Sequence, residues 1–235
     1  KVQPTEDMKG KAGRFAGALK QLGLTNPYAI QAIVATSAKE SGLNPQSKEL
    51  GAGPWLNTIK SKGIGYIYEK LPQLGPGGRV ARQMGFQSGV PVDVLQREWS
   101  KGDPAFFSMV YDGLDTNTQA GDGYKFRGRG FVQITGRKVY ASIGKIIGVD
   151  LENNPDAITN DFDVAAKAAG GYLLNSIGQK DPKRGLAALN NVKDYQSALK
   201  MVVGNVGRGG LGSDTARIDA AFAGDSKLAV NLRGQ

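Results

Sequence analysis

The chain has 235 residues, 40% of them hydrophobic, and a formal net charge of +9 at pH 7. It contains neither cysteine nor histidine, which excludes disulfides, cysteine nucleophiles, Ser-His-Asp triads and zinc sites built from histidine and cysteine. We therefore expect no metal and no cofactor. No apolar run reaches the roughly 18 residues of a membrane-spanning helix, so we expect no stable membrane insertion.

Two helices are predicted in the first part of the chain. The first covers Glu6–Gln21, and Gly23 follows its end. The second begins after Asn26, whose side chain can cap it, has Pro27 at its first position and ends at Gly42. Spacing of i, i+3, i+4 and i+7 predicts one buried face on this helix, formed by Ile30, Ile33, Val34, Ser37 and Ala38.

The middle of the chain is less regular. Residues 43–65 are rich in glycine, proline and polar side chains, which predicts a loop or a short hairpin. Further helices are predicted at Ile64–Leu71, Arg79–Phe86, Val92–Trp99, Lys138–Ile147, Val164–Leu174, Tyr195–Val203 and Thr215–Phe222. We expect a mainly α-helical fold of two lobes, with at most a small β-hairpin, as a single domain over residues 1–235. Because the chain begins with Lys1 rather than Met, we expect either a trimmed form of the protein or a piece of a longer one.

Two glutamates have different predicted surroundings. Glu40 lies in the last turn of the second helix, seven residues after Ile33 and therefore on the apolar face. Partial burial and the negative end of the helix dipole would both favour the protonated form that a general acid needs. Glu49 follows in the polar segment PQSKELGAG, where we expect it to be exposed and ionised. Such a pair is typical of glycosidic bond cleavage, although a glutamate at a helix end or in a loop is often only a surface residue.

Several segments together resemble the family 19 glycoside hydrolases, which include plant-type chitinases and many bacteriophage endolysins. They are SAKESG (37–42), Glu49, VYDG (110–113), GDGYKFRGRGFVQITGRKVY (121–140) and NNPD (153–156). The resemblance implies a lysozyme-like helical fold and an inverting mechanism, with Glu40 as the general acid and Glu49 as the general base. Lys39 stands where most members have a histidine.

The resemblance also implies roles for other residues. Ser47 and Thr135 would orient the attacking water. Substrate contacts are implied for Gln133, Tyr140, Asn205 and Tyr111. Supporting roles are implied for Arg217, Arg127 and Arg129. For at least one of the last two we expect ion pairing that shapes the loop, not direct contact with sugar. The glycines of residues 121–137 would let the backbone turn tightly and run close to a polymeric substrate.

The predicted partner is bacterial cell-wall peptidoglycan, and the predicted reaction is hydrolysis of its β-1,4 bonds between N-acetylmuramic acid and N-acetylglucosamine. A basic protein suits an anionic wall, and secreted plant-type chitinases usually carry disulfides. We expect a phage-encoded bacteriolytic enzyme that is made in the host cytoplasm and acts on the wall, with other virion proteins as partners if the chain is part of a longer one. The alternatives are a chitinase, a non-catalytic wall-binding module and a nucleic-acid binder. The last would leave the two glutamates unexplained, so we expect no nucleic-acid partner.

Overall fold

The computed structural model describes residues 6–114 and 116–206, and over these ranges the chain is mainly α-helical. Its β structure there is limited to isolated bridges, such as the antiparallel bridge between Arg129 and Ile134. The described chain divides into two compact units, which we call the first unit (6–47, 129–134 and 139–206) and the second unit (48–128 and 135–138). The predicted fold class is confirmed, in agreement with the lysozyme-like helical fold that the resemblance implies. No helix among the described residues is long and apolar enough to cross a lipid bilayer.

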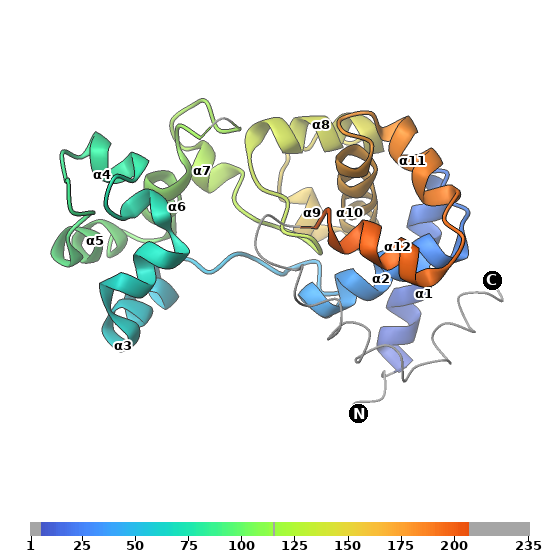
Figure 1. The fold of residues 1–235 in the computed structure, drawn as a ribbon, viewed down its shortest axis with the longest axis horizontal. Coiled ribbons are helices and arrows are strands. Elements are labelled where there is room, and N and C mark those ends of the chain that lie inside the picture. The colour runs from blue at the N-terminus through green and yellow to red at the C-terminus, as the bar shows by residue number, and fades with distance from the viewer. Residues whose placement is uncertain (1–5, 115, 207–235) are drawn as a thin grey trace. The chain divides into compact units, whose positions relative to one another are not determined.

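The first unit contains two helices, α2 (Pro27–Ser41) and α10 (Phe162–Ile177), that are buried on nearly every side. It is built from α1 (Glu6–Gln21), α2, α8 (Arg137–Ile147), α9 (Ala157–Asn160), α10, α11 (Pro182–Asn190) and α12 (Tyr195–Val203), with the first two residues of α8 grouped in the second unit (Figure 1). Four residues of the predicted buried face of α2 are buried, namely Ile30, Ile33, Val34 and Ser37. Burial extends further around the helix than predicted, because α1 and α12 both pack against it. In α10 a small residue, Gly170, allows Leu19 of α1 to approach closely.

The ends of α2 are fixed by the residues that the sequence predicts. The side chain of Asn26 accepts hydrogen bonds from two backbone N–H groups of the first turn, and its amide donates to the carbonyl of Asn190 at the end of α11 (3.1 Å). Gly42 adopts the left-handed conformation (φ 61°) and its N–H donates to the carbonyl of Ala38 (2.7 Å). The Gly42 contact ends α2 and so defines its last turn, which carries Glu40.

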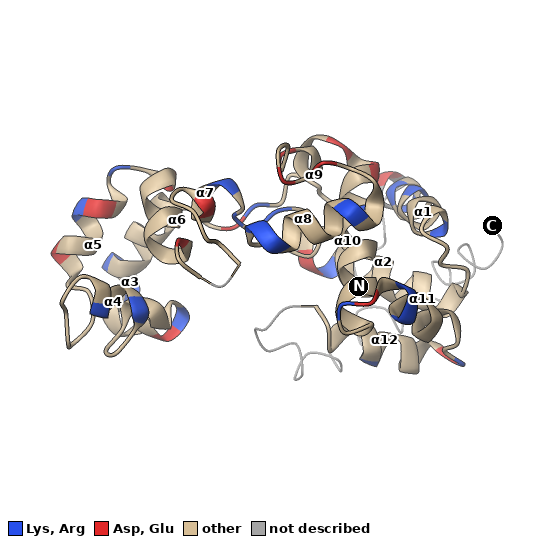
Figure 2. Ribbon diagram, turned by 90° about the horizontal axis from the view of Figure 1, so that it is seen from above, with Lys and Arg blue, Asp and Glu red and all other residues tan. Residues whose placement is uncertain are grey.

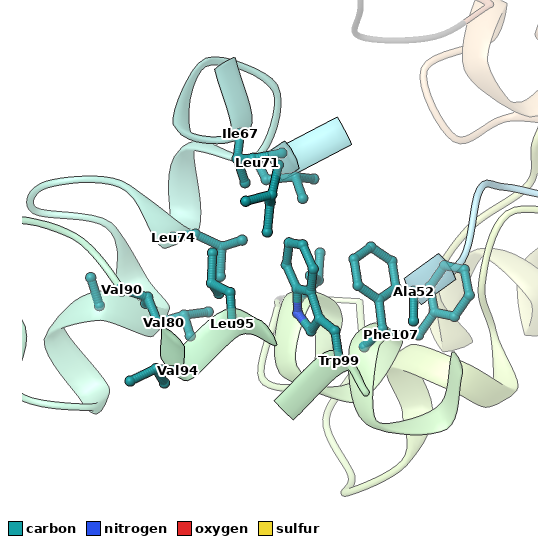
Figure 3. Close-up of a cluster of buried hydrophobic side chains, with 14 residues drawn as sticks. Ala52, Ile67, Leu71, Leu74, Val80, Val90, Val94, Leu95, Trp99 and Phe107 are labelled. Atoms are coloured by element: carbon teal, nitrogen blue, oxygen red, sulfur yellow. The ribbon is translucent and has the colours of Figure 1, made fainter. Parts of the chain in front are cut away.

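The second unit has a separate apolar core. Its elements are α3 (Ala52–Lys70), the 3-10 turn η1 (Pro72–Leu74), α4 (Arg79–Gln83), α5 (Val92–Trp99), α6 (Asp103–Tyr111) and α7 (Asp122–Lys125) (Figure 1). Figure 3 shows that Trp99 lies in the middle of a cluster of leucine, valine and phenylalanine side chains contributed by most of these elements. The ring of Trp99 meets Phe106 edge to face, with 5.0 Å between ring centroids. This core supports α6, whose last residue belongs to the candidate site.

The prediction of a loop or hairpin over residues 43–65 is wrong from Ala52 onward. There α3 begins with its first N–H donating to the side chain of Asp103 (2.9 Å), and it continues across a kink at Gly63 (φ 76°). Trp55 stacks on Phe106, with centroids 6.4 Å apart. Burial of the apolar residues of α3 against α5 and α6 therefore outweighs the weak helix propensity of its glycines and proline.

Most other predicted helices are present. Those predicted at 6–21, 92–99 and 195–203 have the expected bounds, whereas those at 79–86, 138–147 and 164–174 have shifted ends. α6 and α11 were not predicted from the sequence, although each has a proline in its first turn, which is a common start signal. The helix predicted at Thr215–Phe222 lies outside the described residues.

Basic and acidic residues are interspersed along the helices of both units (Figure 2). Several pair locally on the surface, as Lys11 does with Asp7 of α1 (2.8 Å). The net positive charge of the chain is therefore spread over many elements rather than contributed by one basic run.

Candidate active site

The second unit holds the carboxylate of Glu49 between two donors. The hydroxyl of Tyr111, the last residue of α6, donates to Oε1, and the backbone N–H of Gly128 donates to Oε2 (3.4 Å). The N–H of Glu49 in turn donates to the carbonyl of Gly128 (3.3 Å). Glu49 is thus tied to the end of α6 and to Gly128 of the glycine-rich segment 121–137.

The surroundings of Glu49 change its proton affinity. The residue is half-buried, and this burial raises the pKa of its carboxyl above the ordinary value. The hydrogen bonds from Tyr111 and Gly128 favour the ionised form and offset part of the rise. Burial and the nearby carboxylate also raise the pKa of Tyr111, so its hydroxyl stays protonated and can donate. The expectation that Glu49 is exposed is wrong, because its neighbours come from segments that are distant in the sequence.

The segment after α6 is held in place by buried polar contacts that were not predicted from the sequence. Arg137 forms a two-pronged ion pair with Asp122, with nitrogen–oxygen distances of 2.9 and 2.6 Å, and only 2% of the Asp122 side chain is exposed. The hydrogen bonds from Arg137 lower the pKa of Asp122. Asn117, also buried, accepts from the N–H of Arg137 (2.9 Å) and donates to the carbonyl of Tyr111 (3.1 Å). Arg137 and Asp122 both lie in the glycine-rich segment, so the motif itself was the signal that could have identified the pair.

Two glycines of this segment are required by contacts inside the second unit. A Cβ atom at Gly123 would overlap the carbonyl oxygen of Phe107, and one at Gly136 would overlap the side chain of Thr116. Gly136 also has a positive φ of 94°, which glycine adopts without strain. Internal packing therefore explains both glycines, and a close approach to a polymer is not needed to account for them.

Glu40 lies in the first unit, on the last turn of α2, and its side chain is exposed. The expectation of partial burial is wrong, because the buried stretch of α2 ends at Ser37 and Gly42 terminates the helix. Position 40 therefore lies in α2 but beyond its buried part. Its carboxyl group is accessible to a ligand.

Ser47 and Gln133 come together in the first unit. The side-chain nitrogen of Gln133 donates to the carbonyl of Ser47 (3.3 Å), lies 3.5 Å from its hydroxyl oxygen and also donates to the carbonyl of Gly130 (3.1 Å). Gln133 has a positive φ of 52°, which is uncommon for a residue other than glycine. These bonds hold its side chain beside Ser47. Thr135, the other residue expected to orient water, is half-buried and belongs to the second unit.

Arg129 and Tyr140 are internal to the first unit. Only 2% of the Arg129 side chain is exposed; it pairs with Asp156 (2.8 Å) and donates to the hydroxyl of Tyr140 (3.2 Å). Tyr140 is fully buried, so its ring is not accessible for stacking on a sugar, in contrast to the implied substrate contact. Asp156 belongs to the NNPD segment. The pair therefore connects two parts of the motif that lie far apart in the sequence.

The remaining predicted residues have mainly intramolecular contacts. Asn205 accepts from the hydroxyl of Ser176 (3.0 Å), and its amide donates to a backbone carbonyl of α12. Arg127 lies over the ring of Tyr124, 4.3 Å from the centroid, and donates to the carbonyl of the same residue (2.8 Å). Arg217 lies outside the described residues. Among those that are described, no group of three or more acidic side chains is arranged to hold a metal ion.

Comparison with known proteins shows what residues 107–204 are similar to. Residues 107–204, which include Tyr111, Gly128 and Arg137, match the family model of class I chitinases. Residues 107–204 therefore resemble glycoside hydrolase family 19. Glu40 and Glu49 precede the matched family 19 segment.

Relatives of the family 19 segment occur in bacteria and plants. The chain is 36% identical over 83 residues to a glycosyl hydrolase family 19 domain-containing protein of Haemophilus influenzae, a match that covers 32% of this chain and 40% of the relative. It is 42% identical over 74 residues to the acidic 27 kDa endochitinase of Solanum lycopersicum, covering 32% of this chain and 29% of the relative. A 47% identical match of 47 residues to basic endochitinase B of Arabidopsis thaliana covers 20% of this chain and 14% of the relative. The chain thus spans less than half the length of each.

Proposed function

We propose that the protein is a glycoside hydrolase that cleaves β-1,4 bonds of bacterial peptidoglycan. The observation that carries the proposal is the half-buried carboxylate of Glu49, which has one donor on each oxygen. Both donors, Tyr111 and Gly128, belong to the family 19 segment. An oriented carboxylate with increased proton affinity suits a general base that must take a proton from water.

In the proposed reaction Glu40 donates a proton to the glycosidic oxygen, and the bond from this oxygen to the anomeric carbon breaks. Glu49 accepts a proton from a water molecule whose oxygen attacks the anomeric carbon from the opposite face, so the configuration inverts. Glu40 is exposed at the end of its helix and is therefore free to meet a substrate. Ser47 and Thr135 are the proposed water-orienting residues, and Gln133 is the proposed sugar contact.

The choice of peptidoglycan rests on charge and composition. A net charge of +9 favours an anionic wall, and the chain has no cysteine for the disulfides typical of secreted plant-type chitinases. The proposal extends to a bacteriolytic, phage-encoded role at the cell wall. Chitin is the second candidate substrate, because several relatives are named endochitinases and both polymers are β-1,4-linked N-acetylated amino sugars.

The test is mass spectrometry of the fragments released from purified peptidoglycan and from chitin oligomers. We expect muropeptide fragments from the wild type and a loss of roughly 10²–10⁴-fold in turnover for Glu40→Gln and for Glu49→Gln. Glu69→Gln is the matched control, since Glu69 is an exposed glutamate of α3 that pairs with Lys70, and it should retain activity.

Each other result has a defined meaning. If fragments are released from chitin alone, chitin replaces peptidoglycan as the proposed substrate. Binding to the wall without fragments from either polymer would indicate a non-catalytic wall-binding module. Proton NMR of the first-formed sugar should show the α-anomer; a β-anomer at early times would contradict the role of Glu49 as base.

A further inference from the structure

The carboxylate of Glu49 has its orientation set by one donor on each oxygen. The terminal torsion of a glutamate side chain is broad and weakly defined by itself. Tyr111 donates to Oε1 and Gly128 to Oε2, so rotation about that torsion would break both hydrogen bonds. Each carboxylate oxygen still keeps a second lone pair that can accept a proton. The direction of these lone pairs is therefore determined by where the Tyr111 hydroxyl and the Gly128 N–H lie.

The Tyr111 ring is itself supported from within the second unit. It stacks on Phe107, one helical turn earlier in α6, with ring centroids 6.2 Å apart and an angle of 18° between the planes. Phe107 is fully buried in the apolar core. The side chain of Asn117 donates to the Tyr111 carbonyl (3.1 Å) and fixes the backbone at the helix end.

The residues on either side of Tyr111 are held as well. Arg79 donates from Nη2 to the carbonyl of Val110 (2.9 Å). The carboxylate of Asp112 accepts from two N–H groups at the start of α7, at 2.8 and 2.6 Å. Residues 110, 111 and 112 thus each have a tertiary hydrogen bond that involves a side chain, and the direction of the Tyr111 side chain is fixed from both flanks. A tyrosine that only stacked on a ligand would not need its hydroxyl directed at a carboxylate.

We infer that Tyr111 is a positioning residue for Glu49: its hydroxyl holds Oε1 so that the carboxylate presents a free lone pair to the attacking water. This inference rests on the proposed function and changes the role of Tyr111 from the substrate contact that the sequence predicts. The proton moves from water to Glu49, and the tyrosine keeps its own proton throughout, because burial and the adjacent carboxylate disfavour its ionisation. The same bond stabilises the ionised form of Glu49, which is the form that acts as a base.

The first test compares Tyr111→Phe with Tyr68→Phe. Phenylalanine keeps the ring on Phe107 and removes only the hydroxyl. Tyr68 is the matched control, because its hydroxyl donates to the backbone carbonyl of Val90 (2.9 Å) elsewhere in the second unit. For Tyr111→Phe we expect kcat to fall about ten-fold, as for loss of a hydrogen bond to a charged group, with KM nearly unchanged. The acidic limb of the pH–rate profile should move to higher pH, since the ionised base has lost a donor. Tyr68→Phe should change none of these. A rise in KM at unchanged kcat would restore the substrate-contact role and overturn the inference.

A second measurement needs no substrate and separates the inference from the proposed function. Glutamate labelled with carbon-13 at the carboxyl gives a titration curve for Glu49, which is assigned by its loss in Glu49→Gln. Tyr111→Phe should move the midpoint upward, and Tyr68→Phe should not. An unchanged midpoint overturns the inference even if the enzyme is active. A wild type that hydrolyses neither polymer overturns the proposed function, whatever the titration shows.

Discussion

Asp122→Asn should strongly destabilise the second unit. The substitution removes the charge that faces the Arg137 guanidinium, which makes two hydrogen bonds to the carboxylate and is itself only 17% exposed. Breaking a buried ion pair by removing one partner costs about 3–5 kcal/mol, because the other charge stays buried without its counter-ion. Since folded domains are typically stable by about 5–15 kcal/mol, this loss is a large share of the total.

Urea unfolding followed by tryptophan fluorescence measures this loss directly. Both tryptophans of the chain, Trp55 and Trp99, belong to the second unit, so the signal reports on the part that contains Asp122. With a denaturant dependence of roughly 2–3 kcal/mol per molar urea, the midpoint should fall by roughly 1–2.5 M. Glu98→Gln is the control, because Glu98 pairs with the exposed Arg97 and Lys101 and should leave the midpoint nearly unchanged.

The effect should depend on pH in a defined direction. Arg137 lowers the pKa of Asp122 in the folded state, so the stabilisation is complete above the unfolded pKa of about 3.9 and is lost as the pH falls through the lower folded value. The wild type and Asp122→Asn should therefore converge at the lowest pH at which the wild type remains folded. A midpoint that falls no further than in the control, or a difference that is the same at pH 7 and at low pH, would refute the reasoning.

Three other outcomes are expected. Burial raises the pKa of Glu49, so ionised Glu49 destabilises the folded state at pH 7, and this loss disappears as the pH falls toward the unfolded pKa. Glu49→Gln should therefore raise Tm at pH 7, measured by calorimetry, and leave it unchanged near pH 4. An unchanged Tm at pH 7 would contradict the assigned burial. Gly123→Ala should lower the free energy of unfolding by about 1–3 kcal/mol through overlap with the Phe107 carbonyl, whereas Gly53→Ala, with open space around it, should be neutral or stabilising. Lytic rate on cell walls should fall once salt shortens the Debye length to about 8–10 Å, while hydrolysis of short neutral oligomers stays flat; equal salt sensitivity would remove the electrostatic argument.

The sequence by itself determined the features that depend on neighbouring residues. Asn26 and Gly42 set the ends of α2, and α1, α5 and α12 have the predicted bounds, because caps and apolar spacing act within a few residues. The motif from 121 to 140 was sufficient to indicate the family, since it depends on the order of residue types along the chain.

Only the tertiary structure decided how the predicted site residues are buried. Glu49 was expected to be exposed, but its donors Tyr111 and Gly128 lie 62 and 79 residues further along the chain. Tyr140 was expected to meet substrate, and it is instead enclosed beside Arg129. Residues 52–62 are helical because α3 packs on α5 and α6. Burial and proton affinity are set by whatever folding brings into contact, and no local pattern in the sequence records partners that are so distant.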